Sequence, residues 1–242
     1  HHHSETIRVG KKDNHIIDPD TPSAARVVYD YYGGKEKFLS IAEDMMVAVD
    51  KGDSAQFTEA KVLKPEGWGL LNMLMDSRTG LGRFREFKIS NYQLMMQLID
   101  YCGNHTVDQI VAFPDVKERV DLYFDHEGKF KDQFKRCSTV TGNLVVFDLR
   151  NEETINAGNR FMIYALFPDC NISIHILWGL NKLNTVLATG KSILNKTSNT
   201  NIGELMLKYD SGGHENAVTC QVENEDTDRV LAELTAKITA DG

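Results

Sequence analysis

The sequence has few cysteines and no long apolar run, and each shortage excludes a class of protein. Its four cysteines are scattered without close pairs, which excludes a disulfide framework and the spacing of a zinc finger. They are typical of reduced thiols, so we expect a cytoplasmic protein. No apolar stretch approaches the length that spans a membrane, so we expect no membrane partner.

The sequence also lacks an excess of basic residues. It has 27 Lys and Arg against 35 Asp and Glu, a formal net charge of −8. A protein that coats long duplex nucleic acid needs a broad basic surface, so we exclude that class. A small phosphate pocket stays compatible with this balance, especially one whose carboxylates hold a divalent cation. The 242 residues, 41% of them hydrophobic, suit one large or two modest globular domains.

Residues 191–216 contain the pattern that most strongly indicates a ligand site. Lys191 and Ser192 follow an expected strand, residues 201–209 have helical spacing, and Gly212-Gly213-His214 follow that helix. Glycines permit positive φ and a close approach of the backbone to a ligand. Lysine, serine and free N–H groups together suit an anion. The alternative is a glycine that ends the helix and an ordinary surface histidine.

These residues resemble the substrate-binding domain of the DHH phosphoesterases. That family has a Gly-Gly-Gly-His turn with an Arg-Ser or similar pair upstream, and Ser211 stands here at the first glycine. The start of the chain, His1-His2-His3-Ser4, is similar to the Asp-His-His motif of the family, although a purification-tag remnant is the alternative. The resemblance implies an N-terminally truncated chain that is inactive by itself.

A second stretch, residues 49–57, adds a candidate metal ligand. Asp53-Ser54-Ala55-Gln56-Phe57 resembles the fourth motif of the same family, and Asp53 lies 52 positions after His1. An imidazole and a carboxylate at adjacent strand ends can meet at one cation, and Mn²⁺ accepts both ligand types. The alternative is a solvent-exposed loop carboxylate.

An arginine-rich stretch follows at residues 76–85. Arg78, Arg83 and Arg85, with two glycines between the first two, are typical of a loop that lies near phosphate, since the guanidinium fork matches phosphate oxygens. A solvated basic loop is the alternative.

The expected fold class is α/β in three parts. The resemblance implies the C-terminal part of a parallel-sheet DHH domain over residues 1–114. Alternating charges over residues 115–137 predict a helical connector. Expected strands at 143–149, 171–179 and 184–189, with a final helix at 226–239, predict a mixed-sheet α+β domain over 138–242, the DHH-associated domain in the resemblance. His175 is interpreted as a histidine of an edge strand and left out of the site.

The resemblance implies a Mn²⁺-dependent phosphodiesterase or phosphatase. It points to the exopolyphosphatase-related and nanoRNase-like members, which act on short oligonucleotides, linear or cyclic dinucleotides, or related small phosphoesters. His1 and Asp53 would bind metal, with His2 touching the phosphate or a metal ligand. The expected substrate ligands are Lys191, Ser192, Asn195, Gly212, Gly213, His214 and Asn216, with Arg78 and Arg83.

Two other functions stay open, and so does the assembly. The chain could be a nucleotide-binding regulatory module that never turns its ligand over. It could also be an exopolyphosphatase, although the charge of −8 argues against the continuous basic track that polyphosphate needs. A homodimer is one assembly that the resemblance allows.

Overall fold

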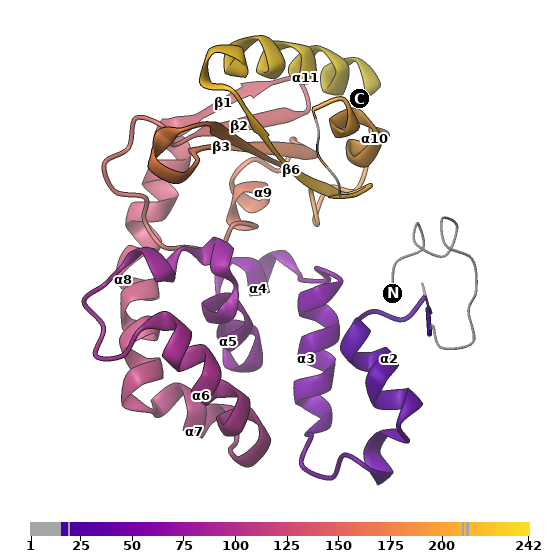
Figure 1. The fold of residues 1–242 in the computed structure, drawn as a ribbon, viewed down its shortest axis with the longest axis vertical. Coiled ribbons are helices and arrows are strands. Elements are labelled where there is room, and N and C mark those ends of the chain that lie inside the picture. The colour runs from indigo at the N-terminus through magenta and orange to yellow at the C-terminus, as the bar shows by residue number, and fades with distance from the viewer. Residues whose placement is uncertain (1–15, 19, 210, 212) are drawn as a thin grey trace. The chain divides into compact units, whose positions relative to one another are not determined.

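The computed structural model describes residues 16–242 except 19, 210 and 212. The chain divides into two compact units, His1–Leu122 and Tyr123–Gly242 (Figure 1). The division falls within helix α8 (Pro114–Cys137), inside the segment that we expected to be a connector, and the three-part domain boundaries stay a prediction. Among the described residues, no helix is both long and apolar enough to cross a membrane.

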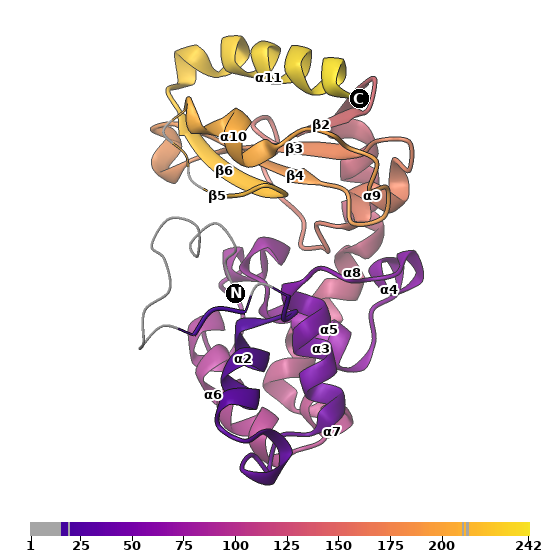
Figure 2. The same ribbon diagram turned by 90° about the vertical axis from the view of Figure 1, so that its right-hand side faces the viewer.

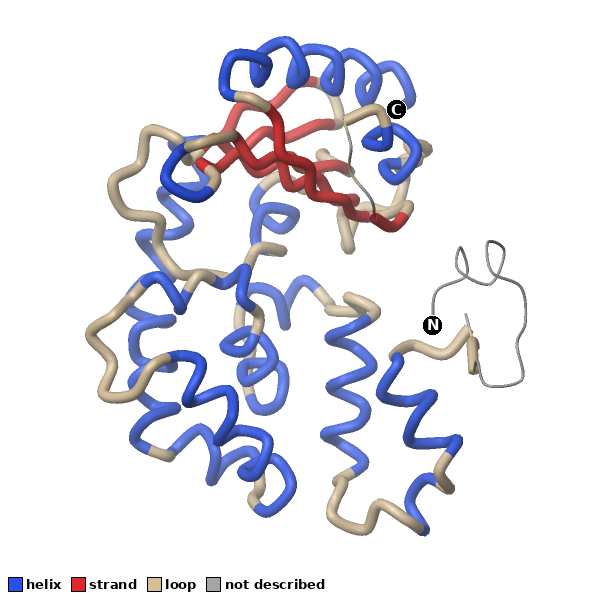
Figure 3. Tube along the Cα trace, in the orientation of Figure 1, coloured by secondary structure: helices blue, strands red, loops and turns tan. Residues whose placement is uncertain are grey.

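The described part of the first unit is helical. Its α-helices before α8 are α2 (Ala24–Tyr31), α3 (Glu43–Asp53), α4 (Glu59–Leu63), α5 (Gly67–Met75), α6 (Asn91–Asn104) and α7 (Val107–Ala112). Short 3₁₀ turns η1 (Gly34–Glu36), η2 (Ser77–Thr79) and η3 (Leu81–Arg83) lie between them. The expected remainder of a parallel sheet is therefore wrong for residues 16–122, where the structure describes no strand (Figure 3).

Capping residues place the starts of several of these helices. The Ser23 hydroxyl accepts a hydrogen bond from the Arg26 amide at the start of α2. Ser90 and Thr106 form complete capping boxes at α6 and α7, with a glutamine three residues later in each case. These side-chain caps satisfy free backbone amides and so fix where α2, α6 and α7 begin.

In the second unit, six described strands form one mixed sheet (Figure 3). They are β1 (Ser138–Thr141), β2 (Leu144–Asp148), β3 (Ile172–Trp178), β4 (Thr185–Lys191), β5 (Gly213–His214) and β6 (Ala217–Val222). The strand order is β1-β2-β3-β4-β6-β5, and β2 and β3 run parallel whereas the other neighbours are antiparallel. The predicted mixed sheet of this half is confirmed.

Alternation along the strands gives the sheet two buried faces. Ile172, Ile174 and Ile176 of β3 point to one face, where helices α10 (Ile202–Leu207) and α11 (Thr227–Asp241) complete the core (Figure 2). The other face receives the short helix α9 (Met162–Leu166) and the C-terminal half of α8. There the Phe134 and Phe147 rings lie 4.3 Å apart.

The strand order also corrects one expectation. His175 lies on β3, which has a neighbour on each side, so it is not on an edge strand. The sequence shows each strand but not the pairing, and pairing decides which strand is central.

Candidate functional site

The end of β4 brings Lys191 against a hairpin from a later part of the chain. The Lys191 amide donates to the Asn216 carbonyl at 2.8 Å, just past the last paired residues of β4 and β6. The Lys191 ammonium lies 3.2 Å from the Glu215 carboxylate. The two partners differ in environment, since 15% of the Lys191 side chain is exposed against 64% of Glu215. A cation with most of its stem buried is thus held toward an exposed turn.

The hairpin consists of β5, β6 and the two connecting residues Glu215 and Asn216. Gly213 is needed for its geometry, because a Cβ there would lie 2.7 Å from Val218 Cγ2 and 2.8 Å from the Ala217 carbonyl oxygen. Both distances are shorter than any ordinary carbon contact. The sequence predicted a close approach of this glycine to a ligand; the structure shows a close approach to the backbone of β6, and contact with a ligand stays a prediction.

Helix α10 fixes the other side of this hairpin. The Ile202 amide at the start of α10 donates to the Glu215 carbonyl at 3.0 Å. The Asn201 side chain caps the same helix by accepting from the Glu204 amide at 3.1 Å. A Cβ on Gly203 would lie 3.3 Å from the His214 backbone, so a small residue lets the helix sit close. The turn that carries Glu215 is therefore held on two sides, by β4 and by α10.

His214 and Asn216, two other predicted ligands, are both exposed on this hairpin. The structure thus brings Lys191, Gly213, His214 and Asn216 together, as the sequence pattern predicted. It adds Glu215, which the sequence pattern had not led us to include in the site. A carboxylate directly between a glycine-histidine turn and an asparagine was the available signal, because an acid beside an expected anion site either competes with the anion or binds a cation.

Ser192 and Asn195 have structural partners in the loop after β4. The buried Ser192 hydroxyl accepts from the Leu194 amide at 3.2 Å and from the Asn195 amide at 2.9 Å. The Asn195 side chain donates to the Pro168 carbonyl at 3.2 Å and accepts from the Thr197 hydroxyl at 2.7 Å. These bonds shape the loop that follows Lys191, so any role of the two side chains toward a ligand stays a prediction. Gly212 lies outside the described residues.

Asp53 has a setting different from the one we expected. It is the last residue of α3 and is exposed, whereas we expected it at the end of a strand. The helix continues through Lys51 and Gly52, and Gly52 packs closely against the Asn72 side chain of α5. Asp50, about one turn earlier in the same helix, accepts hydrogen bonds from Arg26 and from the Ser23 hydroxyl.

The described residues contain no group of three or more His, Cys, Asp or Glu side chains that could hold a metal ion. His1 and His2 lie outside the described residues. The donor set that the structure describes is therefore insufficient for a metal site, and Asp53 is the one predicted metal ligand whose position it gives.

The arginine loop forms a compact turn in the first unit. Asp76 Oδ1 accepts from the Arg78 amide at 2.9 Å and from Arg78 Nε at 2.8 Å, so one of the predicted cations is partly neutralised. Gly80 has a φ of 86°, and a Cβ on it would lie 2.0 Å from Arg83 Nη1. The Arg83 guanidinium therefore lies over the glycine. Both arginines are exposed, and their role toward phosphate stays a prediction.

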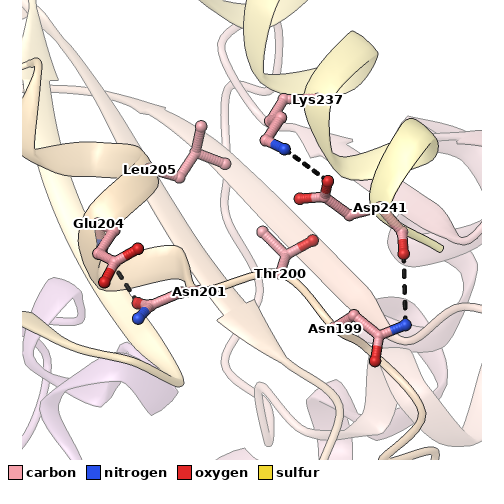
Figure 4. A pocket seen from close by; sticks show the side chains of 7 residues that line it. All are labelled: Asn199, Thr200, Asn201, Glu204, Leu205, Lys237 and Asp241. Atoms are coloured by element: carbon pink, nitrogen blue, oxygen red, sulfur yellow. Dashed lines mark hydrogen bonds and ion pairs between the residues drawn. The ribbon is translucent and has the colours of Figure 1, made fainter.

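A shallow hollow of about 460 Å³ lies elsewhere on the second unit, between the start of α10 and the end of α11 (Figure 4). Its cation, Lys237, lies 2.6 Å from the Asp241 carboxylate, and the Asn199 side chain donates to the Asp241 carbonyl at 3.4 Å. Lys191 and the hairpin turn do not line this hollow. We therefore identify the candidate site by the residues that meet at the end of β4, and it does not coincide with this hollow.

Comparison with known proteins gives a strong match to a solved structure. A solved structure described as the pGpG-specific phosphodiesterase PggH from Vibrio cholerae is 60% identical, with a TM-score of 0.80. The match covers 96% of this chain and 78% of that one. An uncharacterised protein from Helicobacter pylori G27, at 13% identity and a TM-score of 0.27, carries no weight; it covers 86% of this chain and 52% of its own. No family model and no curated protein matches the sequence.

This match corrects the family expected from the sequence. The assignment to the DHH phosphoesterases, in their exopolyphosphatase-related or nanoRNase-like branches, depended on short motifs around His1, Asp53 and Gly213. A relationship over 96% of the chain replaces it, and no family model supports the earlier assignment.

Proposed function

Because the chain belongs to the same family as the pGpG-specific phosphodiesterase PggH, we propose that it is a phosphodiesterase that hydrolyses the linear dinucleotide pGpG. The observation that carries the proposal is 60% identity over 96% of the chain. In this reaction water attacks the phosphorus of the one internucleotide phosphodiester, and the 3′ oxygen of the first nucleoside leaves with a proton. Each pGpG consumes one water and yields two GMP.

The hairpin turn supplies a place for the 5′-terminal phosphate of such a substrate. Lys191 provides a positive charge at the turn, and its mostly buried stem limits the entropy lost when it binds. A contact with the terminal phosphate, far from the scissile bond, orients a short substrate for in-line attack. Such orientation contributes several kcal/mol to catalysis. In the structure the Glu215 carboxylate forms an ion pair with the Lys191 ammonium. The 5′-terminal phosphate would take the place of this exposed carboxylate.

The proposed activity is tested by product analysis with the full-length protein. With pGpG as the substrate, we expect two GMP per molecule hydrolysed, measured by chromatography of the nucleotides. Cyclic di-GMP, a ten-nucleotide RNA and polyphosphate serve as comparison substrates and should be consumed at least about tenfold more slowly. Binding of pGpG without hydrolysis would favour the regulatory module instead. Faster release of phosphate from polyphosphate would favour the exopolyphosphatase.

We also propose Mn²⁺ as the cofactor, with Asp53 as one of its ligands. A divalent cation bound there would stabilise the charge that develops on the phosphate oxygens. The support from this chain is the position of Asp53: a carboxylate at the C-terminus of a helix faces the negative end of the helix dipole, so it gains from a cation nearby.

Asp53→Asn is expected to weaken Mn²⁺ binding about tenfold or more, measured by the paramagnetic signal of free Mn²⁺ in a titration of the full-length protein. Asp108→Asn, an exposed acid in the first turn of α7, is the matched control and should leave binding unchanged. Equal Mn²⁺ affinity in the wild type and Asp53→Asn would remove Asp53 from the metal site.

A further inference from the structure

A pocket of about 170 Å³ lies within the first unit, between α3 and the segment that leads from α4 into α5. Its walls are apolar and come from Val47 and Ala48 on α3, Phe57 and Pro65 in the loops, and Met73 on α5. Met73 and Pro65 are buried, whereas Val47 is 40% exposed at the mouth. An apolar pocket of this size suits one flat ring system, since an engineered cavity of about 150 Å³ binds benzene.

Gly69 of α5 keeps this pocket open. A Cβ on Gly69 would meet no atom within 4 Å, so packing within the described chain does not require a glycine there. Helix propensity favours alanine over glycine at such a position. Gly52 on the facing helix differs, because its Cβ would lie 2.3 Å from the Asn72 amide. Gly103 and Gly128 are as open as Gly69 but line no part of the pocket.

Charged groups lie at the rim of the pocket. Two are lysines, Lys51 and Lys61, and two are acids, Asp44 and Glu66. Asp44 accepts from the Trp68 indole at 2.9 Å, and this contact holds its carboxylate at the rim between α3 and α5. Lys61 pairs with Glu66. The pocket thus combines apolar walls with both hydrogen-bond acceptors and donors at its opening.

We infer that this pocket binds the guanine base of a nucleotide. The inference rests on the proposed function for the source of the base, and it names the part of the substrate that the first unit would recognise. Apolar walls take the faces of the ring, and the methionine sulfur and the phenylalanine ring make favourable contacts with an aromatic system. The ring edge then meets the polar rim.

The charges at the rim match guanine better than adenine. Guanine presents two adjacent donors, N1–H and the N2 amino group, which one carboxylate can accept together. Its O6 and N7 are acceptors that suit a lysine. Adenine offers an acceptor, N1, where guanine has a donor, and a carboxylate repels it. Discrimination between the two bases therefore follows from the acids at the rim, and affinity for both follows from the apolar walls.

The test fills the pocket from one wall. Gly69→Leu should weaken binding of GMP to the full-length protein at least about tenfold by isothermal titration calorimetry, because the added side chain occupies the space of the ring. Gly103→Leu on α6 makes the same change at an open helical glycine away from the pocket and should leave GMP binding unchanged. Val47→Phe narrows the mouth from α3, at a position exposed enough to tolerate the ring, and should also weaken binding.

Several outcomes are decisive. Thermal unfolding shows whether each variant is folded, and Val47→Phe carries the test if Gly69→Leu is not. Wild-type binding of GMP that both folded variants retain would overturn the inference, as would equal wild-type affinity for AMP and GMP. If the wild type binds GMP through this pocket but does not hydrolyse pGpG, the proposed function fails and the pocket stands. If it hydrolyses pGpG and Gly69→Leu keeps the KM of the wild type, the function stands and the pocket fails.

Discussion

Replacing Lys191 by methionine is expected to lower kcat/KM for pGpG roughly 10- to 150-fold. A hydrogen bond to a charged group contributes about 1.5–3 kcal/mol, and methionine keeps most of the buried stem while it removes the ammonium. The measurement is the rate of GMP formation over a range of pGpG concentrations. Lys208→Met is the matched control, because Lys208 pairs with Glu233 at 3.1 Å in the same unit and lies outside the hairpin turn.

Glu215→Gln separates a role in binding from a role in structure. Both Lys191→Met and Glu215→Gln break the same ion pair, which contributes little to stability because its carboxylate is 64% exposed and solvent screens the attraction. Glu215→Gln leaves the Lys191 ammonium available for phosphate, so we expect this variant to have a lower KM for pGpG than the wild type. Lys191→Met should have a higher KM. GpG, which lacks the 5′ phosphate, should bind the wild type and Lys191→Met alike. If both variants lose activity equally, Lys191 only holds the hairpin in place.

Most of the second unit could be predicted from the sequence. Strands β2, β3 and β4 and helix α11 lie within two residues of their expected positions, because period-two and helical spacing are strong there. The grouping of Lys191 with the Gly213–His214 turn was also expected, and β4 and β6 pair so that it occurs. Local periodicity fixes which face is buried, and the turn residues fix where each strand stops.

The first unit shows where this reasoning fails. Helix α3 (Glu43–Asp53) includes Asp53, which we expected at the end of a strand, and α5, which contributes four buried residues, was not predicted. The sequence of α5 begins Gly67-Trp68-Gly69, and glycines argue against a helix when only propensity is considered. The burial of Leu70, Leu71 and Leu74 stabilises it regardless. Asp53 was misplaced for the same reason, since packing extends α3 through Gly52.

The family of the protein could not be predicted correctly from short motifs. A few residues around a glycine-histidine turn matched a known motif, and they led to a phosphoester chemistry that agrees with the proposed function. They did not lead to the right family, because short motifs sample only the site and not the 242 residues around it.

The environment of His175 differs from the edge strand that we expected from the sequence. It lies on the central strand β3, with the Phe147 ring 5.3 Å away and the Phe134 ring 6.0 Å away. Burial, and secondarily the positive charge of Arg160, lowers the pKa of His175 to about 4. A histidine of the unfolded chain has a pKa near 6.5. Between these two values the unfolded chain binds more protons at this residue than the folded protein does. The contribution of His175 to the pH dependence is therefore a loss of stability as the pH falls from 6.5 toward 4.

His175→Phe is expected to remove that loss. The free energy of unfolding of the wild type should fall by up to about 3 kcal/mol between pH 7 and pH 4 because of this histidine, less whatever share solvent screens. The measurement is urea unfolding at several pH values, followed by Trp178 fluorescence in a Trp68→Phe background, so that the signal comes from β3. The buried His126, whose pKa burial also lowers, is present in both proteins and cancels in the difference. Ile174→Val, on the opposite face of the same strand, is the control for packing alone, and it should shift the curve by a constant amount. If the difference between wild type and His175→Phe is likewise constant with pH, His175 is not held neutral by its surroundings.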